Sequence, residues 1–158
     1  MDKHILSIIA QNKPGVISRI AGLLRRKQFN IDSMTAGKTH KPGVSRLDIV
    51  FLGDRKEAER AVVMVQKVVE VLEAKIVSEN IVIREIVLGK FRIHHPAEES
   101  LLYDTENIYT HEVFRQGNVV CLEIVDTSQH MDTYLEKIQN SNIEILEWVR
   151  SGVIAIEK

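Results

Sequence analysis

The sequence predicts an α+β protein made of two consecutive βαββαβ units, each a ferredoxin-like sandwich in which a four-stranded sheet carries both helices on one face. Three observations support this class. Segments with helical spacing of apolar residues alternate with runs rich in β-branched residues. The second half repeats the order of elements of the first, and 158 residues suffice for two small domains. A polar segment at 78–80 separates them, so the predicted domains are 1–78 and 79–158.

The first half reads as one complete βαββαβ unit. Residues 4–10 are rich in β-branched side chains and lead into a Pro-Gly turn, which is typical of a strand that ends in a loop. Helical periodicity follows at about 15–28, where Arg25, Arg26 and Lys27 complement the helix dipole in the last turn. The remaining predicted elements are strands at 31–39 and 44–52, a helix that opens at Gly53–Asp54 with a buried apolar stripe from Ala58 to Val69, and a strand at Val71–Val77.

The second half repeats this order. Pro96 opens a helix, Gly117–Asn118 forms a hairpin turn, and Ser128 is a candidate cap for the second helix. Each sheet would leave one face bare, and domains this small usually cover such a face with another domain or subunit, so we expect a homo-oligomer. The predicted elements are strands at 81–90, 108–115 and 118–126, helices at 96–106 and after Ser128, and closing strands at Ile143–Val149 and Val153–Ile156.

Charge and cysteine content narrow the class of function. The chain has 21 Lys and Arg residues against 22 Asp and Glu residues, so it lacks the basic excess that nucleic-acid binding requires. The single cysteine, Cys121, excludes an intramolecular disulfide and points to a reducing compartment. The N-terminal apolar run is too short for a signal sequence, and no segment reaches the roughly 18–20 apolar residues of a membrane span. We therefore expect a cytoplasmic protein with neither a nucleic-acid nor a membrane partner.

No cluster of catalytic or metal-binding residues stands out in the sequence. The closest glycines, Gly37 and Gly43, are too far apart for a dinucleotide- or phosphate-binding loop. None of the six histidines pairs with another at the spacing of two metal ligands on one helix face, and adjacent side chains such as His94 and His95 point apart on a strand. We therefore predict no catalytic residue and no metal site. A small enzyme on a ferredoxin-like scaffold is the alternative, and turnover by the purified chain would reveal it.

Three further features each allow two interpretations. Cys121 lies in an apolar strand segment and reads as a small core residue, with a reactive thiol as the alternative. The basic residues 25–27 are either a solvated helix end or a contact patch. Trp148 is either a core side chain or a contact residue, since an indole supplies a large buried area in both settings.

The turn at 12–17 is the one loop with the features of a ligand site. It joins the first strand to the first helix, where free backbone N–H groups at the positive end of the helix dipole can receive a carboxylate. Pro14 fixes its own φ, and Gly15 lets a ligand approach the backbone closely. An ordinary helix start explains the same residues. Asn30 likewise is either a turn residue that tolerates left-handed φ or an amide that donates to a ligand's carboxylate.

Five segments carry a family resemblance. They are ILSIIAQNKPGVISRIAGLL (5–24), FNIDSMT (29–35), SRLDI (45–49), REIVLGK (84–90) and VRSGVIAI (149–156). The first three resemble the ACT domain of the small, regulatory subunit of acetolactate synthase, and the last two resemble that family's C-terminal domain. The resemblance therefore covers nearly the whole chain, whereas a generic ACT domain would share only the Gly15 turn and the order of elements.

This resemblance implies a noncatalytic subunit that raises the activity of a catalytic large subunit and makes it sensitive to valine. Thiamine diphosphate, Mg²⁺ and FAD would belong to the catalytic subunit, and this chain would bind no cofactor. In the family, two ACT domains pair side by side as a homodimer, with the amino acid at their interface. Carried over by position, the implied valine-binding residues are Asn12, Gly15, Val16 and Ile17 of one protomer with Asn30 and Ile31 of the other. One methylene in an apolar wall discriminates by only about 1–3 kcal/mol, so leucine or isoleucine could also bind.

The chain departs from the family pattern in two places. Gln28 precedes Phe29 where the family usually has glycine, so this turn has to accommodate a side chain. Residues 91–118 also fit the pattern poorly.

An alternative function is a free-standing ACT-type amino-acid sensor that regulates another enzyme or a transcription factor. The protein that co-purifies with the chain would distinguish the two.

Overall fold

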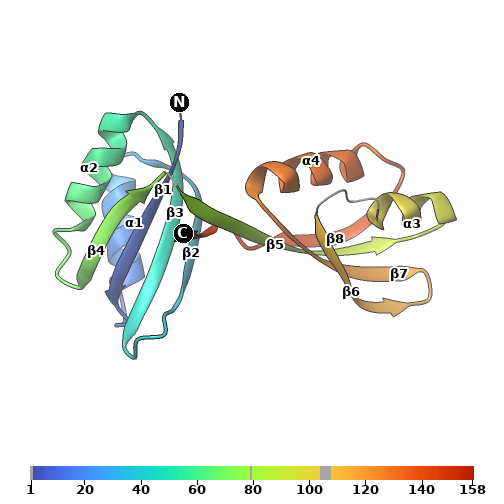
Figure 1. The fold of residues 1–158 in the computed structure, drawn as a ribbon, viewed down its shortest axis with the longest axis horizontal. Helices are drawn as coiled ribbons and strands as arrows, with labels where there is room; N and C mark the ends of the chain where they lie inside the picture. The colour runs from blue at the N-terminus through green and yellow to red at the C-terminus, as the bar shows by residue number, and fades with distance from the viewer. Residues whose placement is uncertain (1, 79, 104–107) are drawn as a thin grey trace. The chain divides into compact units, whose positions relative to one another are not determined.

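The structure is a computed structural model that describes residues 2–78, 80–103 and 108–158. It divides into two compact units, each with the βαββαβ order predicted from the sequence (Figure 1). The first unit holds the described residues up to Val82 together with Val153–Lys158, and the second holds Ile83–Gly152. The predicted fold class is therefore confirmed. The division falls at Val82 instead of residue 78, and the last strand lies in the first unit instead of the second.

The first unit is a four-stranded antiparallel sheet in the order β2-β3-β1-β4, with α1 and α2 on one face (Figure 1). Strand alternation decides what each face carries: Leu6, Ile8 and Ile49 are fully buried beneath the helices. The intervening residues Ser7 and Asp48 point to the opposite face, which is also covered, because both are nearly inaccessible. The elements are β1 (Asp2–Gln11), α1 (Val16–Arg26), β2 (Asn30–Lys38), β3 (Val44–Gly53), α2 (Arg55–Val65) and β4 (Val71–Val77).

The second helix is shorter than its apolar stripe predicts. It ends at Val65, and Lys67 N–H then donates to the Met64 carbonyl at 3.2 Å in a tighter turn. Val68 still reaches the core, but Val69 is 89% exposed, so the prediction that Val69 completes the buried stripe was wrong. Because the helix stops before it, helical periodicity no longer decides which way Val69 points.

The second unit repeats the topology, with the strand order β6-β7-β5-β8 and with β9 pairing to β5. Its core joins α3 and α4 to one face of the sheet, and the Tyr134 hydroxyl in α4 donates to the Leu102 carbonyl in α3 at 2.9 Å. Thr127, not Ser128, caps α4. The elements are β5 (Ile81–Arg92), α3 (Pro96–Tyr103), β6 (Tyr109–Gln116), β7 (Val119–Asp126), α4 (Ser128–Gln139) and β8 (Glu144–Arg150). Although it pairs with β5, β9 (Ile154–Glu157) belongs to the first unit. Residues 104–106 of the predicted helix at 96–106 lie outside the described residues.

Gly89 in β5 makes room for an aromatic ring of the second core. A Cβ at this position would lie 2.5 Å from Cζ of Phe91, whose fully buried ring cannot move aside without disturbing its neighbours. We expect Gly89→Ala to lower the free energy of unfolding of the second unit by about 2–3 kcal/mol, as measured by urea denaturation. Gly37→Ala is the control, since a Cβ at this strand position meets nothing within 4 Å. Equal stability of the two variants would contradict this account.

Candidate functional site

The turn that leads into α1, residues Asn12–Ile17, is called the α1 turn below. It starts where β1 ends, and Asn12 N–H donates to the Gly43 carbonyl in the neighbouring hairpin at 2.8 Å. Gly15 is the N-cap of α1 and has φ 83°, a left-handed conformation that favours glycine. A Cβ at Gly15 would have no atom within 4 Å, so the space beside the helix start is open. The turn thus presents backbone at an uncrowded helix N-terminus.

Some of the backbone donors at the start of α1 have no acceptor among the described residues. Gly15 offers no capping side chain, and the first turn of α1 contains no acidic residue. Within the described ranges, the N–H groups of Gly15, Ile17 and Ser18 have no acceptor. In α2, by contrast, the Asp54 carboxylate accepts from Glu57 N–H at 2.8 Å in a full capping box. The α1 turn therefore offers free donors at the positive end of a helix dipole, a setting that favours a carboxylate.

Two features surround the α1 turn: an exposed apolar side chain, Ile17, and an ion pair between Arg19 and Glu70. Ile17 is 47% exposed and is the apolar side chain available to a ligand, whereas Val16 packs in the core. Arg19 pairs with Glu70, and its hydrogen bond lowers the pKa of Glu70, which stays ionised at neutral pH. The positive potential at the turn therefore comes from backbone dipoles, because the guanidinium charge is already compensated.

Asn30 and Ile31 lie at the opposite end of the sheet. Asn30 begins β2 and is level with Leu52 in β3, which pairs with Lys3 near the start of β1. The α1 turn follows Gln11 at the other end of β1, about 26 Å away at the usual rise per strand residue. Asn30 is exposed, and Ile31 packs partly against the helix-covered core. One chain therefore does not bring the two predicted halves of the site together.

The turn before Asn30 has a backbone geometry that glycine usually provides, although its left-handed position holds Gln28. Gln28 has φ 61°, its N–H donates to the Arg25 carbonyl at 2.9 Å, and Phe29 N–H donates to the Leu24 carbonyl at 3.2 Å. These two bonds form a Schellman motif, in which the left-handed position is usually glycine. The side chain at Gln28 is therefore accommodated at a conformational cost and without a change of turn.

We expect Gln28→Gly to raise the free energy of unfolding of the first unit by about 0.5–1 kcal/mol, because glycine adopts the left-handed conformation without strain. Lys27→Gly is the control: Lys27 has φ −98°, so glycine there relieves nothing and should be neutral or destabilising. Urea denaturation of both variants measures the difference. A loss of stability in Gln28→Gly would show that the turn is not strained.

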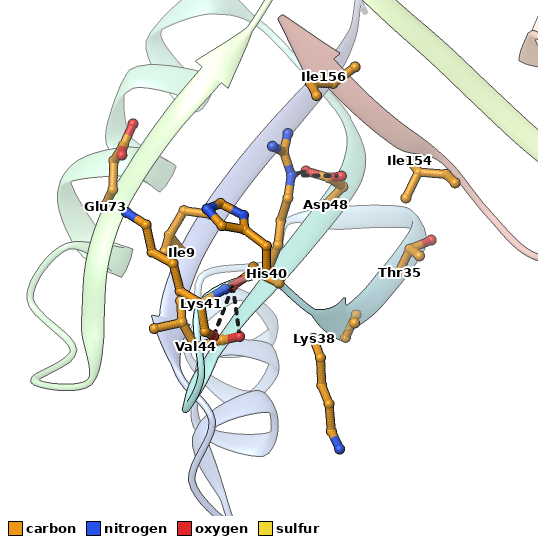
Figure 2. Close-up of a pocket in the computed structure, with 14 residues that line it drawn as sticks. Ile9, Thr35, Lys38, His40, Lys41, Val44, Asp48, Glu73, Ile154 and Ile156 are labelled. Atoms are coloured by element: carbon orange, nitrogen blue, oxygen red, sulfur yellow. Dashed lines mark hydrogen bonds and ion pairs between the residues drawn. The ribbon is translucent and has the colours of Figure 1, made fainter.

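The opposite face of the first sheet carries a cavity that the sequence did not indicate (Figure 2). Its volume is about 470 Å³, and none of the six predicted site residues lines it. Figure 2 shows Ile154 and Ile156 of β9 beside Asp48. The lining residues are Ile9, Thr35, Ala36, Gly37, Lys38, Thr39, His40, Lys41, Val44, Arg46, Asp48, Glu73, Ile154 and Ile156.

The charged residues of β3 in this cavity hold the C-terminal strand. Arg46 Nε donates to Asp48 Oδ1 at 3.0 Å, and the same two side chains bind both backbone groups of Ala155. Ala155 N–H donates to Asp48 Oδ2 at 3.2 Å, and the Arg46 guanidinium donates to the Ala155 carbonyl. Asp48 is 1% exposed and is fully used by these contacts. We call Arg46, Asp48 and Ala155 the β9 clasp. It serves a structural purpose and leaves no free charge for a ligand.

A second contact holds the end of β9. The Lys75 ammonium donates to Glu157 at 2.6 Å, and this hydrogen bond raises the pKa of Lys75. Lys158 N–H donates to the Asn80 carbonyl at 2.8 Å. In the sequence, Arg46 and Asp48 alternate with apolar residues along the predicted strand at 44–52, which places both on the face opposite the helix-covered core. A buried charge pair on the other face is the signal that could have indicated the clasp.

Cys121 and Trp148 each had two interpretations in the sequence. Cys121 is half-buried on the face of β7 opposite Val120 and Leu122, so its expected position in the core was wrong. Trp148 packs against the second core, as the core interpretation predicts.

His94, a candidate metal ligand, bonds through Nε2 to Glu144 at 2.9 Å and is exposed. In the part of the chain that the structure describes, no three His, Cys, Asp or Glu side chains gather as metal ligands, and no helix is long and apolar enough to cross a membrane.

Among the described residues of the second unit, Glu85 and Asp126 are buried and charged, and both are hydrogen-bonded; Asp126 accepts from Thr127 N–H and bonds to His130 Nδ1. Glu85 is 3% exposed and accepts a hydrogen bond from the Ser128 hydroxyl at 2.6 Å and another from Arg150. These residues connect β5, α4 and β8. These bonds therefore tie two strands and a helix of the second unit together.

Comparison with known proteins covers both units. A family model described as an AHAS small subunit-like ACT domain matches residues 6–73, and one described as the small subunit of acetolactate synthase matches residues 84–158. The acetolactate synthase small subunit of Buchnera aphidicola is 30% identical over 157 residues, which cover 99% of this chain and 99% of the relative. The small subunit of isozyme 3 from Escherichia coli is 29% identical, over 99% of this chain and 96% of the relative.

A solved structure is similar over the full length. The crystal structure of the acetolactate synthase small subunit from Thermotoga maritima has a TM-score of 0.86 and 29% sequence identity, and the match covers 100% of this chain and 98% of that one. The similarity therefore extends to both units and to the order of their elements.

Proposed function

The chain belongs to the acetolactate synthase small-subunit family, and from this membership we propose that it activates a catalytic large subunit and makes it sensitive to feedback inhibition by valine. A regulatory-subunit role follows from the family. The sensitivity to valine and the increase in activity are the parts that we propose. The observation that carries them is the α1 turn, whose free donors suit the carboxylate of an amino acid.

The proposed valine site is shared by two copies of the chain. Gly15 and Ile17 of one protomer would contribute backbone donors and an apolar contact, Asn12 its exposed side-chain amide, and Asn30 and Ile31 of the other would close the pocket. Two facts support this arrangement: the two groups lie at opposite ends of one sheet, and β2, which begins at Asn30, is an edge strand. In a side-by-side pair with two-fold symmetry, the start of β2 in one copy faces the α1 turn of the other. Val16 would contribute least of the predicted residues, because its side chain is buried and its N–H donates to the Lys13 carbonyl at 3.4 Å.

Valine bound between two copies would regulate by favouring one state of the dimer. An effector shifts an equilibrium only by the difference between its affinities for the two states. A coupling free energy of about 1–3 kcal/mol changes the affinity of a partner by roughly 5- to 150-fold. Such a coupling is sufficient for feedback control, and it needs no catalytic residue in this chain.

The catalytic partner supplies the chemistry in this proposal. Thiamine diphosphate, Mg²⁺ and FAD are assigned to the large subunit, and the small subunit to effector binding and activation. The absence from the sequence of a glycine-rich phosphate loop supports this division. A cytoplasmic location is part of the same proposal and rests on the single cysteine.

Reconstitution tests the proposal directly. The purified chain is added to the catalytic subunit of the same organism, and acetolactate formation is measured with and without valine, leucine or isoleucine. We expect a several-fold rise in activity and inhibition by valine at saturation of the small subunit. Unchanged activity and an unchanged response to valine would refute the regulatory role. A free-standing sensor would give the same negative result but would still bind the amino acid in calorimetry. The match of residues 84–158 to the small-subunit model is the observation that disfavours a sensor.

A further inference from the structure

A groove between α1 and α2 is lined by basic and apolar side chains. Its volume is about 530 Å³, and it runs between the last turn of α1 and the segment that follows α2. We call it the α1–α2 groove. Its lining residues are Arg19, Leu23, Arg26, Lys27, Met64, Lys67, Val68 and Val69. Among the described residues, no acidic side chain lines it.

The groove lies where the chain concentrates positive charge. Residues 16–27 and 55–67 together contain eight basic and two acidic residues, although the whole chain has 21 basic and 22 acidic ones. This segregation makes the helix-covered face of the first unit positive while the protein as a whole is nearly neutral. The basic residues 25–27 are therefore part of a larger patch, not an isolated helix end.

Three cations of the groove have no ion-pair partner among the described residues. Arg19 is neutralised by Glu70, but no carboxylate in the described ranges lies within ion-pair distance of Arg26, Lys27 or Lys67. All three side chains are exposed. An incoming carboxylate would therefore meet uncompensated positive charge without having to displace an internal partner.

The groove also carries apolar surface: Val68 packs in the core, whereas Val69 is uncovered. Val69 is 89% exposed, and Leu23 and Met64 are half-buried. A methionine adapts to differently shaped apolar partners, and an amphipathic helix typically lays its apolar face in such a groove. The cations and apolar residues together fit an occupant that carries both carboxylates and apolar side chains.

We propose that the α1–α2 groove docks an acidic amphipathic segment of the catalytic subunit, an inference that rests on the proposed function. Its carboxylates would pair with Arg26, Lys27 and Lys67, and its apolar side chains would cover Val69 and its neighbours. A nucleic-acid backbone would leave the apolar residues uncovered. A membrane surface is too flat to enter a groove between two helices. The unpaired cations and the exposed apolar side chains of the groove therefore favour a peptide partner.

Adjacent arginines provide a matched test. Arg26 lines the groove and Arg25 does not, yet both are exposed residues in the last turn of α1. Arg26→Glu and Arg25→Glu thus change net charge and helix-dipole energy equally. Affinity for the catalytic subunit is measured by surface plasmon resonance at two ionic strengths. We expect Arg26→Glu to weaken binding by about tenfold and to reduce its dependence on salt, and Arg25→Glu to change it by less than about twofold.

Two exposed valines, one inside the groove and one outside it, test the apolar contacts in the same way. Val69 lines the groove, and Val63, 54% exposed in α2, does not. Val69→Asn should weaken binding several-fold at both ionic strengths, and Val63→Asn should leave it unchanged. Calorimetric titration of each variant with valine should give the wild-type affinity, because these residues lie outside the α1 turn.

The outcomes separate the two proposals. If the wild-type chain binds and activates the catalytic subunit but both arginine variants bind equally well, the groove assignment is wrong and the proposed function stands. If the wild-type chain does not bind the catalytic subunit at all, the proposed function fails and the groove assignment fails with it. Tight binding of duplex DNA by the wild-type chain that is lost only in Arg26→Glu would also overturn the peptide assignment.

Discussion

Gly15→Asp is expected to abolish inhibition by valine while leaving activation of the catalytic subunit intact. The new carboxylate would sit beside the free N–H groups of the α1 turn, where it occupies the donors and repels the carboxylate of the effector. The surroundings have room for it, because a Cβ at Gly15 meets no atom within 4 Å. Loss of a partly buried charge–dipole interaction of about 2 kcal/mol corresponds to a roughly 30-fold weaker affinity for valine.

Gly15→Asn is the matched control for this substitution. Asparagine and aspartate have nearly the same shape, and both tolerate left-handed φ better than most residues, so the strain at φ 83° is common to the two variants. Only aspartate adds charge. Inhibition curves of the reconstituted enzyme should show a far larger loss of valine response for aspartate. Equal losses would mean that strain, not charge, is responsible, and full valine response in Gly15→Asp would remove the α1 turn from the site.

Asp48→Ala is expected to release the C-terminal strand from the first unit. The substitution leaves the Arg46 Nε–H and the Ala155 N–H without their acceptor, at a position that is 1% exposed. We expect the free energy of unfolding of the first unit to fall by about 2–3 kcal/mol. Hydrogen exchange of the Ala155 amide should become faster at the same time, because this amide would lose its only described acceptor.

Asp32→Ala removes the same charge from an exposed site. Asp32 pairs with Lys3 at 2.9 Å, but both side chains are nearly half exposed, so the pair should contribute less than about 1 kcal/mol. Asp48→Asn should lie between the two alanine variants, since the amide oxygen can still accept from Ala155 while the ion pair is lost. If Asp48→Ala were no less stable than Asp32→Ala, the β9 clasp would not be what holds the strand.

The sequence was most informative where structure depends on near neighbours. The turn at Asn12–Ile17 and its place before a helix could be predicted, because Pro-Gly punctuation and apolar spacing are local signals. The same reasoning failed at Val69, where the apolar pattern continues past the end of the helix. It failed again at Cys121, which alternation along β7 places on the opposite side of the sheet from Val120 and Leu122. In both cases the residue type was apolar, but the backbone decided its direction.

The sequence by itself determined the order of elements, the two βαββαβ units and the family, because periodicity and motifs are properties of short segments. Only the tertiary structure decided that the α1 turn and Asn30 lie at opposite ends of one sheet, and that Ala155 reaches a partner 107 positions earlier in the chain. It also decided that Arg26, Lys67 and Val69 line one groove. These are relations between distant segments. They follow from strand register and helix packing, which depend on the energy of the whole fold and leave no local pattern in the chain.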